Sequence, residues 1–136
     1  MDNSQLYTEW MKYAQADFVA AVHLTSHHPV QLEIVCFHCQ QAGEKALKAV
    51  LAYHNEQIPR THNLYELLQL CQVHHTEILT GLADQADQLT NFAVITRYPN
   101  DEIEVTEVDM NLALKNAGQI LSYVKALTIT QGSQIT

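Results

Sequence analysis

Apolar residues recur at three- and four-residue steps along almost the whole chain, which is the spacing of one face of an α-helix. The pattern predicts helices over 4–24, 30–54 and 76–95, a short helix from Asn63 and a last helix from Glu107. No run alternates strictly between β-branched and polar residues, as a half-buried strand would. Four glycines and three prolines allow few turns. We therefore expect an all-α fold, an antiparallel up-and-down bundle of about five helices.

Two helix starts carry capping residues. Asn63 is followed three residues later by Glu66, the spacing of a capping box. Thr106 stands in the same relation to Asp109, whose carboxylate also suits the positive end of a helix. These pairs predict where the third and last helices begin.

The length of 136 residues is typical of one domain. We expect a single domain over 1–130 and a flexible tail over 131–136. No apolar stretch of about 20 residues predicts a membrane span, and the polar segment 1–4 does not resemble a signal peptide, so the expected location is the cytoplasm. The three cysteines are an odd number, which argues against a disulfide framework. We expect them to be buried small apolar residues rather than metal ligands.

Acidic residues dominate the charge. Fifteen Asp and Glu against seven Lys and Arg give a net charge of −8, so the chain is a poor candidate for non-specific DNA binding. No Lys or Arg lies between Arg60 and Arg97. Cations are therefore scarce, and Lys45, Lys48, Arg60 and Arg97 are the candidates for binding an anion.

Three segments, taken in order, resemble a known family. They are FHCQQAGEKALKAVL at 37–51, PRTHNL at 59–64 and RYPND at 97–101. Together they are similar to the HEPN domain family (higher eukaryotes and prokaryotes nucleotide-binding), over nearly the whole chain. The resemblance implies a helical bundle, usually a homodimer, often encoded beside a small nucleotidyltransferase in toxin–antitoxin pairs. It implies nucleotide or RNA as ligand and no cofactor, and many such domains are metal-independent endoribonucleases.

The ribonuclease site of that family is an Arg-x4–6-His motif before the last helix. Arg97 is the one arginine in that place, but Glu102, Ile103 and Glu104 occupy the histidine positions, and no histidine follows His75. A guanidinium still binds phosphate through its planar fork of donors. The resemblance therefore predicts binding of a nucleotide or of a nucleic-acid phosphate at Arg97, with cleavage doubtful.

Weaker candidates for the same site are Tyr98, Lys45, Lys48 and His62. The two lysines share a helix face that also fits a solvated surface with a Glu44–Lys48 ion pair. His62 precedes a helix cap and also fits a structural role in ordering its loop. Two other functions stay open: an endoribonuclease toxin with a non-standard base such as His62, and a pure protein-interaction module.

Two further features carry expectations about packing. Asp17 lies on an otherwise apolar helix face, where a carboxylate needs a partner from another helix or a raised pKa. Tyr7, Trp10 and the outer residues of the last helix supply more apolar surface than a five-helix monomer needs, which favours a homodimer.

Overall fold

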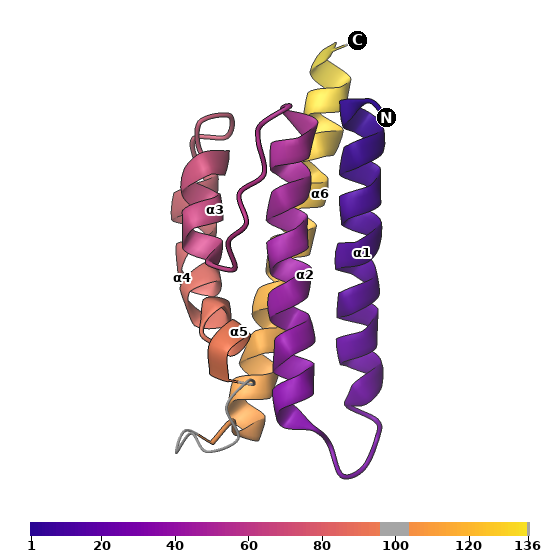
Figure 1. Ribbon diagram of the computed structural model, residues 1–136, viewed down its shortest axis with the longest axis vertical. Helices are drawn as coiled ribbons and strands as arrows, with labels where there is room; N and C mark the ends of the chain where they lie inside the picture. The colour runs from indigo at the N-terminus through magenta and orange to yellow at the C-terminus, as the bar shows by residue number, and fades with distance from the viewer. Residues whose placement is uncertain (96–103, 136) are drawn as a thin grey trace.

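The computed structural model describes residues 1–95 and 104–135, and over these residues the chain is helical with no strand (Figure 1). The predicted all-α class is confirmed. The helices are α1 (Asn3–Leu24), α2 (Leu32–Tyr53), α3 (Leu64–Cys71), α4 (Ile78–Thr90), α5 (Phe92–Ile95) and α6 (Glu107–Ile135).

Helix α2 forms the centre of the bundle, because side chains on nearly every face of it are buried from Val35 to Ala52. Small residues in its middle let neighbouring helices approach closely. A Cβ atom on Gly43 would lie 3.0 Å from Cδ2 of Leu64 and 3.3 Å from Cδ1 of Ile120. Helices α3 and α6 therefore pack directly on the backbone of α2.

The connection over 54–63 returns along α2 before α3 begins (Figure 1). The carbonyl oxygen of His62 accepts a hydrogen bond from Nε2 of Gln40, near the beginning of α2, at 3.0 Å. At the far end of α3, Nε2 of His75 lies 2.9 Å from Nε2 of His54, at the end of α2. Helix α3 therefore runs parallel to α2, unlike the antiparallel succession that we predicted, because the connection is long enough to reverse the chain first.

The helix predicted over 76–95 is divided into α4 and α5 at Asn91. The hydroxyl of Thr90 donates to the carbonyl oxygen of Ala86 at 2.8 Å and accepts from the backbone N–H of Leu64 at 3.0 Å. Such side-chain bonding to the preceding turn competes with the helix ladder and bends helices. At the other end of the chain, the α6 backbone remains helical to Ile135, through the segment for which the sequence predicts a tail.

The predicted cap of α6 is confirmed: Thr106 and Asp109 exchange hydrogen bonds in both directions, at 3.2 and 2.9 Å. At α3, Asn63 caps the N–H of Glu66 at 3.2 Å, but the Glu66 carboxylate accepts from Thr61 at 2.9 Å instead of from the Asn63 backbone. None of the helices, as far as the structure describes them, is long and apolar enough to cross a membrane.

Candidate functional site

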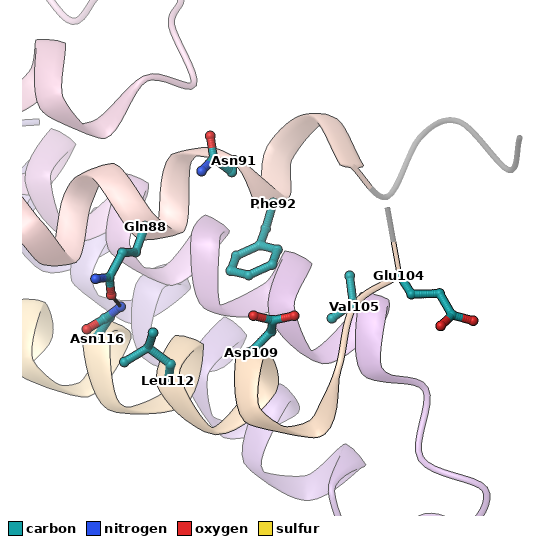
Figure 2. A pocket seen from close by; sticks show the side chains of 8 residues that line it. All are labelled: Gln88, Asn91, Phe92, Glu104, Val105, Asp109, Leu112 and Asn116. Atoms are coloured by element: carbon teal, nitrogen blue, oxygen red, sulfur yellow. Dashed lines mark hydrogen bonds between the residues drawn. The ribbon is translucent and has the colours of Figure 1, made fainter. Parts of the chain in front are cut away.

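A pocket of about 220 Å³ lies between the end of α4, the short helix α5 and the first turns of α6 (Figure 2). Its walls combine amide and carboxylate side chains with apolar ones: Gln88, Asn91, Phe92, Glu104, Val105, Asp109, Leu112 and Asn116. The Phe92 ring and the Asp109 carboxylate face each other across it (Figure 2).

Asn116 is the most deeply buried polar group of this pocket, with 4% of the residue exposed. Its Nδ2 donates to Oε1 of Gln88 at 2.7 Å. Within the described part of the chain, its carbonyl oxygen Oδ1 has no hydrogen-bond donor. Buried polar atoms are paired in the great majority of cases, so this acceptor is the kind of group that a ligand or water satisfies.

The charge of the pocket is negative. Oδ2 of Asp109 accepts from the backbone N–H and the hydroxyl of Thr106, at 2.9 and 3.0 Å, which leaves Oδ1 for other donors. Glu104 adds a second, exposed carboxylate at the edge. Among the residues that the structure describes, the lining includes no Lys or Arg. A phosphate therefore needs a cation from beyond these residues, whereas a ligand group that donates hydrogen bonds suits the walls.

The candidate residues Arg97 and Tyr98 belong to the segment 96–103, which lies outside the described residues. The chain on both sides of that segment is described, and it borders the pocket: Phe92 comes shortly before the segment, and Glu104 directly follows it. Among the cavities that the structure describes, this pocket is the one whose lining residues lie closest to Arg97 along the chain.

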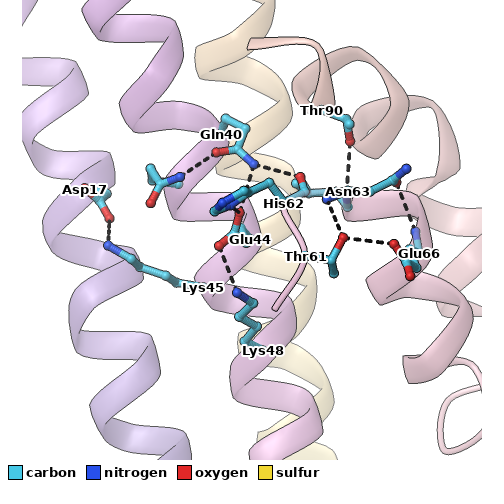
Figure 3. Close-up of polar contacts among 12 residues, drawn as sticks. Asp17, Gln40, Glu44, Lys45, Lys48, Thr61, His62, Asn63, Glu66 and Thr90 are labelled. Carbon is cyan, nitrogen blue, oxygen red and sulfur yellow. Dashed lines mark hydrogen bonds and ion pairs between the residues drawn. The ribbon is translucent and has the colours of Figure 1, made fainter. Parts of the chain in front are cut away.

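A second polar feature, the Glu44 cluster, joins α2 to the connection that precedes α3 (Figure 3). The Glu44 carboxylate is 6% exposed and accepts from Lys48 at 3.0 Å, His62 at 2.8 Å and Gln40 at 3.1 Å. Burial alone would raise the pKa of Glu44, but the hydrogen bonds from His62, Lys48 and Gln40 outweigh it, and the pKa is lowered. Glu44 is therefore a carboxylate at neutral pH.

Asp17 has the partners from another helix that its position predicts. Its two carboxylate oxygens bind Nδ1 of His38 at 3.0 Å and Nζ of Lys45 at 2.5 Å, both on α2. These contacts hold α1 against α2.

The candidate residues of the sequence thus fall into two places. Lys48 and His62 meet at Glu44, the predicted Glu44–Lys48 pair is present, and Lys45 is paired with Asp17. None of Lys45, Lys48 and His62 lines the pocket beside α6. Both ammonium groups already have a carboxylate, which favours the structural interpretation of this helix face.

The three cysteines, Cys36, Cys39 and Cys71, are buried and unpaired by disulfides, as predicted. Burial raises the pKa of each thiol to about 12, so none is a thiolate at neutral pH. Over the described ranges, no three His, Cys, Asp or Glu side chains are arranged to hold a metal ion.

Tyr7 and Trp10 are partly buried against the core of the same chain. The Tyr7 ring meets Tyr53 edge-on at 6.0 Å, and Nζ of Lys48 lies 5.9 Å from the centre of the Trp10 ring. Part of the apolar surface expected to favour a homodimer is therefore used within one chain.

Sequence reasoning named Glu104 and Asp109 in other roles but did not predict the pocket that they line. One signal was available: Asn116 interrupts the apolar stripe formed by Ala113, Ala117 and Ile120, so it is a polar residue at a core position. Gln88 and Asn91 carry no such signal, because exposed amides on a helix are ordinary.

The fold and the pocket together define a small helical-bundle domain with a polar cavity at the start of its last long helix. The family model described as "HEPN domain" matches residues 7–127. The chain therefore belongs to the HEPN domain family, as its sequence resemblance predicts.

Two solved structures have the same fold. One is ST0689, an archaeal HEPN homologue, with 28% identity and a TM-score of 0.71, covering 89% of this chain and 96% of that one. The other is TT1696 from Thermus thermophilus, with 23% identity and a TM-score of 0.73, covering 88% and 96%; at this identity the likeness concerns the fold alone. No curated protein matches the chain.

Proposed function

We propose that this protein binds a nucleotide or a terminal nucleotide of RNA in the pocket beside α6, with Arg97 holding the phosphate, and without efficient cleavage. The observation that carries the proposal is the pocket itself, which borders both ends of the segment that contains Arg97. Membership of the HEPN domain family adds support.

The charges of the pocket support one orientation of the ligand. Carboxylates of Asp109 and Glu104 repel phosphate from the walls, while the amides of Gln88 and Asn116 suit a polar base edge. The base then enters, and the phosphate stays outside with Arg97, whose guanidinium keeps its charge at any physiological pH.

The absence of a histidine after His75 supports binding over cleavage. A base that deprotonates a 2′-hydroxyl works best with a pKa near the working pH, and the histidine positions of the motif hold Glu102, Ile103 and Glu104. We further propose that the protein acts as a homodimer in the cytoplasm with a nucleotidyltransferase-type partner, in a system of the toxin–antitoxin kind.

Calorimetric titration with a mononucleotide such as AMP tests the proposal. We expect heat of binding for the wild type and a loss of at least tenfold in affinity for Arg97→Ala, since a charge-assisted contact is worth roughly 1.5–3 kcal/mol. Arg60→Ala is the matched control, because it removes an exposed arginine that does not line the pocket. Equal affinity in all three proteins contradicts the role of Arg97.

A further inference from the structure

The described lining residues of the pocket beside α6 leave hydrogen-bond acceptors unused. Oδ1 of Asn116 is buried and unpaired within the described ranges, and Oδ1 of Asp109 is not used by the α6 cap. The amide of Gln88 supplies donors beside them, since its Oε1 is the atom that Asn116 occupies. A ligand that fits must therefore carry a hydrogen-bond donor on the edge that reaches the buried Oδ1 of Asn116.

The shape of the pocket fits a flat ring. Phe92 and Leu112 form apolar walls on opposite elements, α5 and α6 (Figure 2). Any nucleobase can stack on an aromatic side chain, because every base has a flat π-face. The volume of about 220 Å³ is below the roughly 300–1,000 Å³ of sites that enclose a whole small ligand. Only the base end of a nucleotide enters.

We propose that the pocket selects a nucleobase with an exocyclic amino group, such as adenine or cytosine, and that this amino group donates to Oδ1 of Asn116. A keto group at the same position, as in hypoxanthine or uracil, would place an oxygen against that oxygen. The inference rests on the proposed function and names the part of the nucleotide that is recognised.

Two pairs of nucleotides test the amino group. AMP carries an amino group beside an unprotonated ring nitrogen where IMP carries a keto oxygen beside a ring N–H, and CMP and UMP differ in the same way. A keto oxygen would leave the buried Oδ1 of Asn116 unpaired, so we expect AMP over IMP and CMP over UMP by about tenfold or more in calorimetric affinity. IMP binding as tightly as AMP, together with UMP binding as tightly as CMP, overturns the inference and leaves the proposed function standing.

Substitutions assign the effect to Asn116. Asn116→Leu replaces the amide with an apolar side chain of similar size, and we expect it to abolish the preference for amino-bearing bases. Asn111→Leu, the same change at an exposed position of α6, is expected to keep it. Asn116→Asp retains an acceptor and is expected to keep the preference too. Preference retained in folded Asn116→Leu contradicts the assignment.

Arg97→Ala separates the two proposals. It is expected to lower the affinities for AMP, IMP, CMP and UMP by the same factor, so that the AMP/IMP and CMP/UMP affinity ratios stay unchanged. If none of the four nucleotides binds to the wild type, both the inference and the proposed function fail. If Asn116→Leu does not fold, the two ligand pairs on the wild type and the Asn116→Asp variant still decide the question.

Discussion

Removal of the Glu44 carboxylate tests how the buried ion cluster contributes to stability. Glu44→Ala deletes the acceptor of three hydrogen bonds and leaves the Lys48 residue, 8% exposed, without its carboxylate. Breaking a buried ion pair by removing one partner costs about 3–5 kcal/mol, because the other charge stays buried and uncompensated. The His62 side chain is 54% exposed and can hydrogen-bond to water instead, so the loss of its contact with Glu44 contributes little to the destabilisation.

We therefore expect Glu44→Ala to lower the free energy of unfolding by about 3 kcal/mol, out of a total of roughly 5–15 kcal/mol for a domain. Urea denaturation followed by circular dichroism measures the change. With a slope near 2 kcal/mol/M, the midpoint falls by about 1.5 M. Asp87→Ala, which removes an exposed carboxylate from α4, is the control and is expected to stay within about 0.5 kcal/mol of the wild type.

The double variant Glu44→Ala with Lys48→Met checks the cause. Since no unpaired ammonium remains, we expect it to recover more than about 1 kcal/mol relative to Glu44→Ala. A loss below about 1 kcal/mol in Glu44→Ala, or a further loss on adding Lys48→Met, refutes the reasoning that an uncompensated buried cation dominates.

Three other predictions concern stability. Burial first, and the neighbouring imidazoles second, lower the pKa of His54 to about 4 from 6.5, so the folded chain resists a proton that the unfolded chain takes up. The free energy of unfolding should therefore fall as the pH drops from 6.5 to 4. Because His54 is partly exposed, we expect this fall to be only about 1–2 kcal/mol larger in the wild type than in His54→Gln, as measured by unfolding at each pH. An equal slope in both proteins contradicts this. Thr106→Ala should cost about 1 kcal/mol in thermal melts, because it removes the α6 cap; no change refutes it. Gly118→Ala should stabilise the fold by about 0.5–1 kcal/mol, since its new Cβ lies at an ordinary contact distance of 3.4 Å from Phe18. Gly43→Ala should destabilise the fold, because its Cβ crowds three side chains. A Gly43→Ala variant more stable than Gly118→Ala refutes this prediction.

Periodicity predicts the helices because most of them bury one stripe of local residues, although α2 is buried on nearly every face. It also predicts the burial of the cysteines and the need of Asp17 for a partner, since both follow from a residue's position on its own helix. The Glu44–Lys48 pair is local in the same sense, being one helical turn apart.

Contacts between distant segments are the part that sequence reasoning could not supply. The pairing of His54 with His75 depends on how far the connection over 54–63 travels back along α2. The break at Asn91 depends on Thr90, which bonds to the start of another helix. The pocket residues Gln88 and Asn116 meet only because α4 and α6 lie side by side.

Amide chemical-shift mapping with AMP tests the central claim most directly, because it locates the ligand on the protein. We expect the largest shifts at 88–92 and 104–116, the residues around the pocket, and small shifts along α1. No saturable shifts, or shifts centred on the Glu44 cluster with the pocket unaffected, would contradict nucleotide binding beside α6.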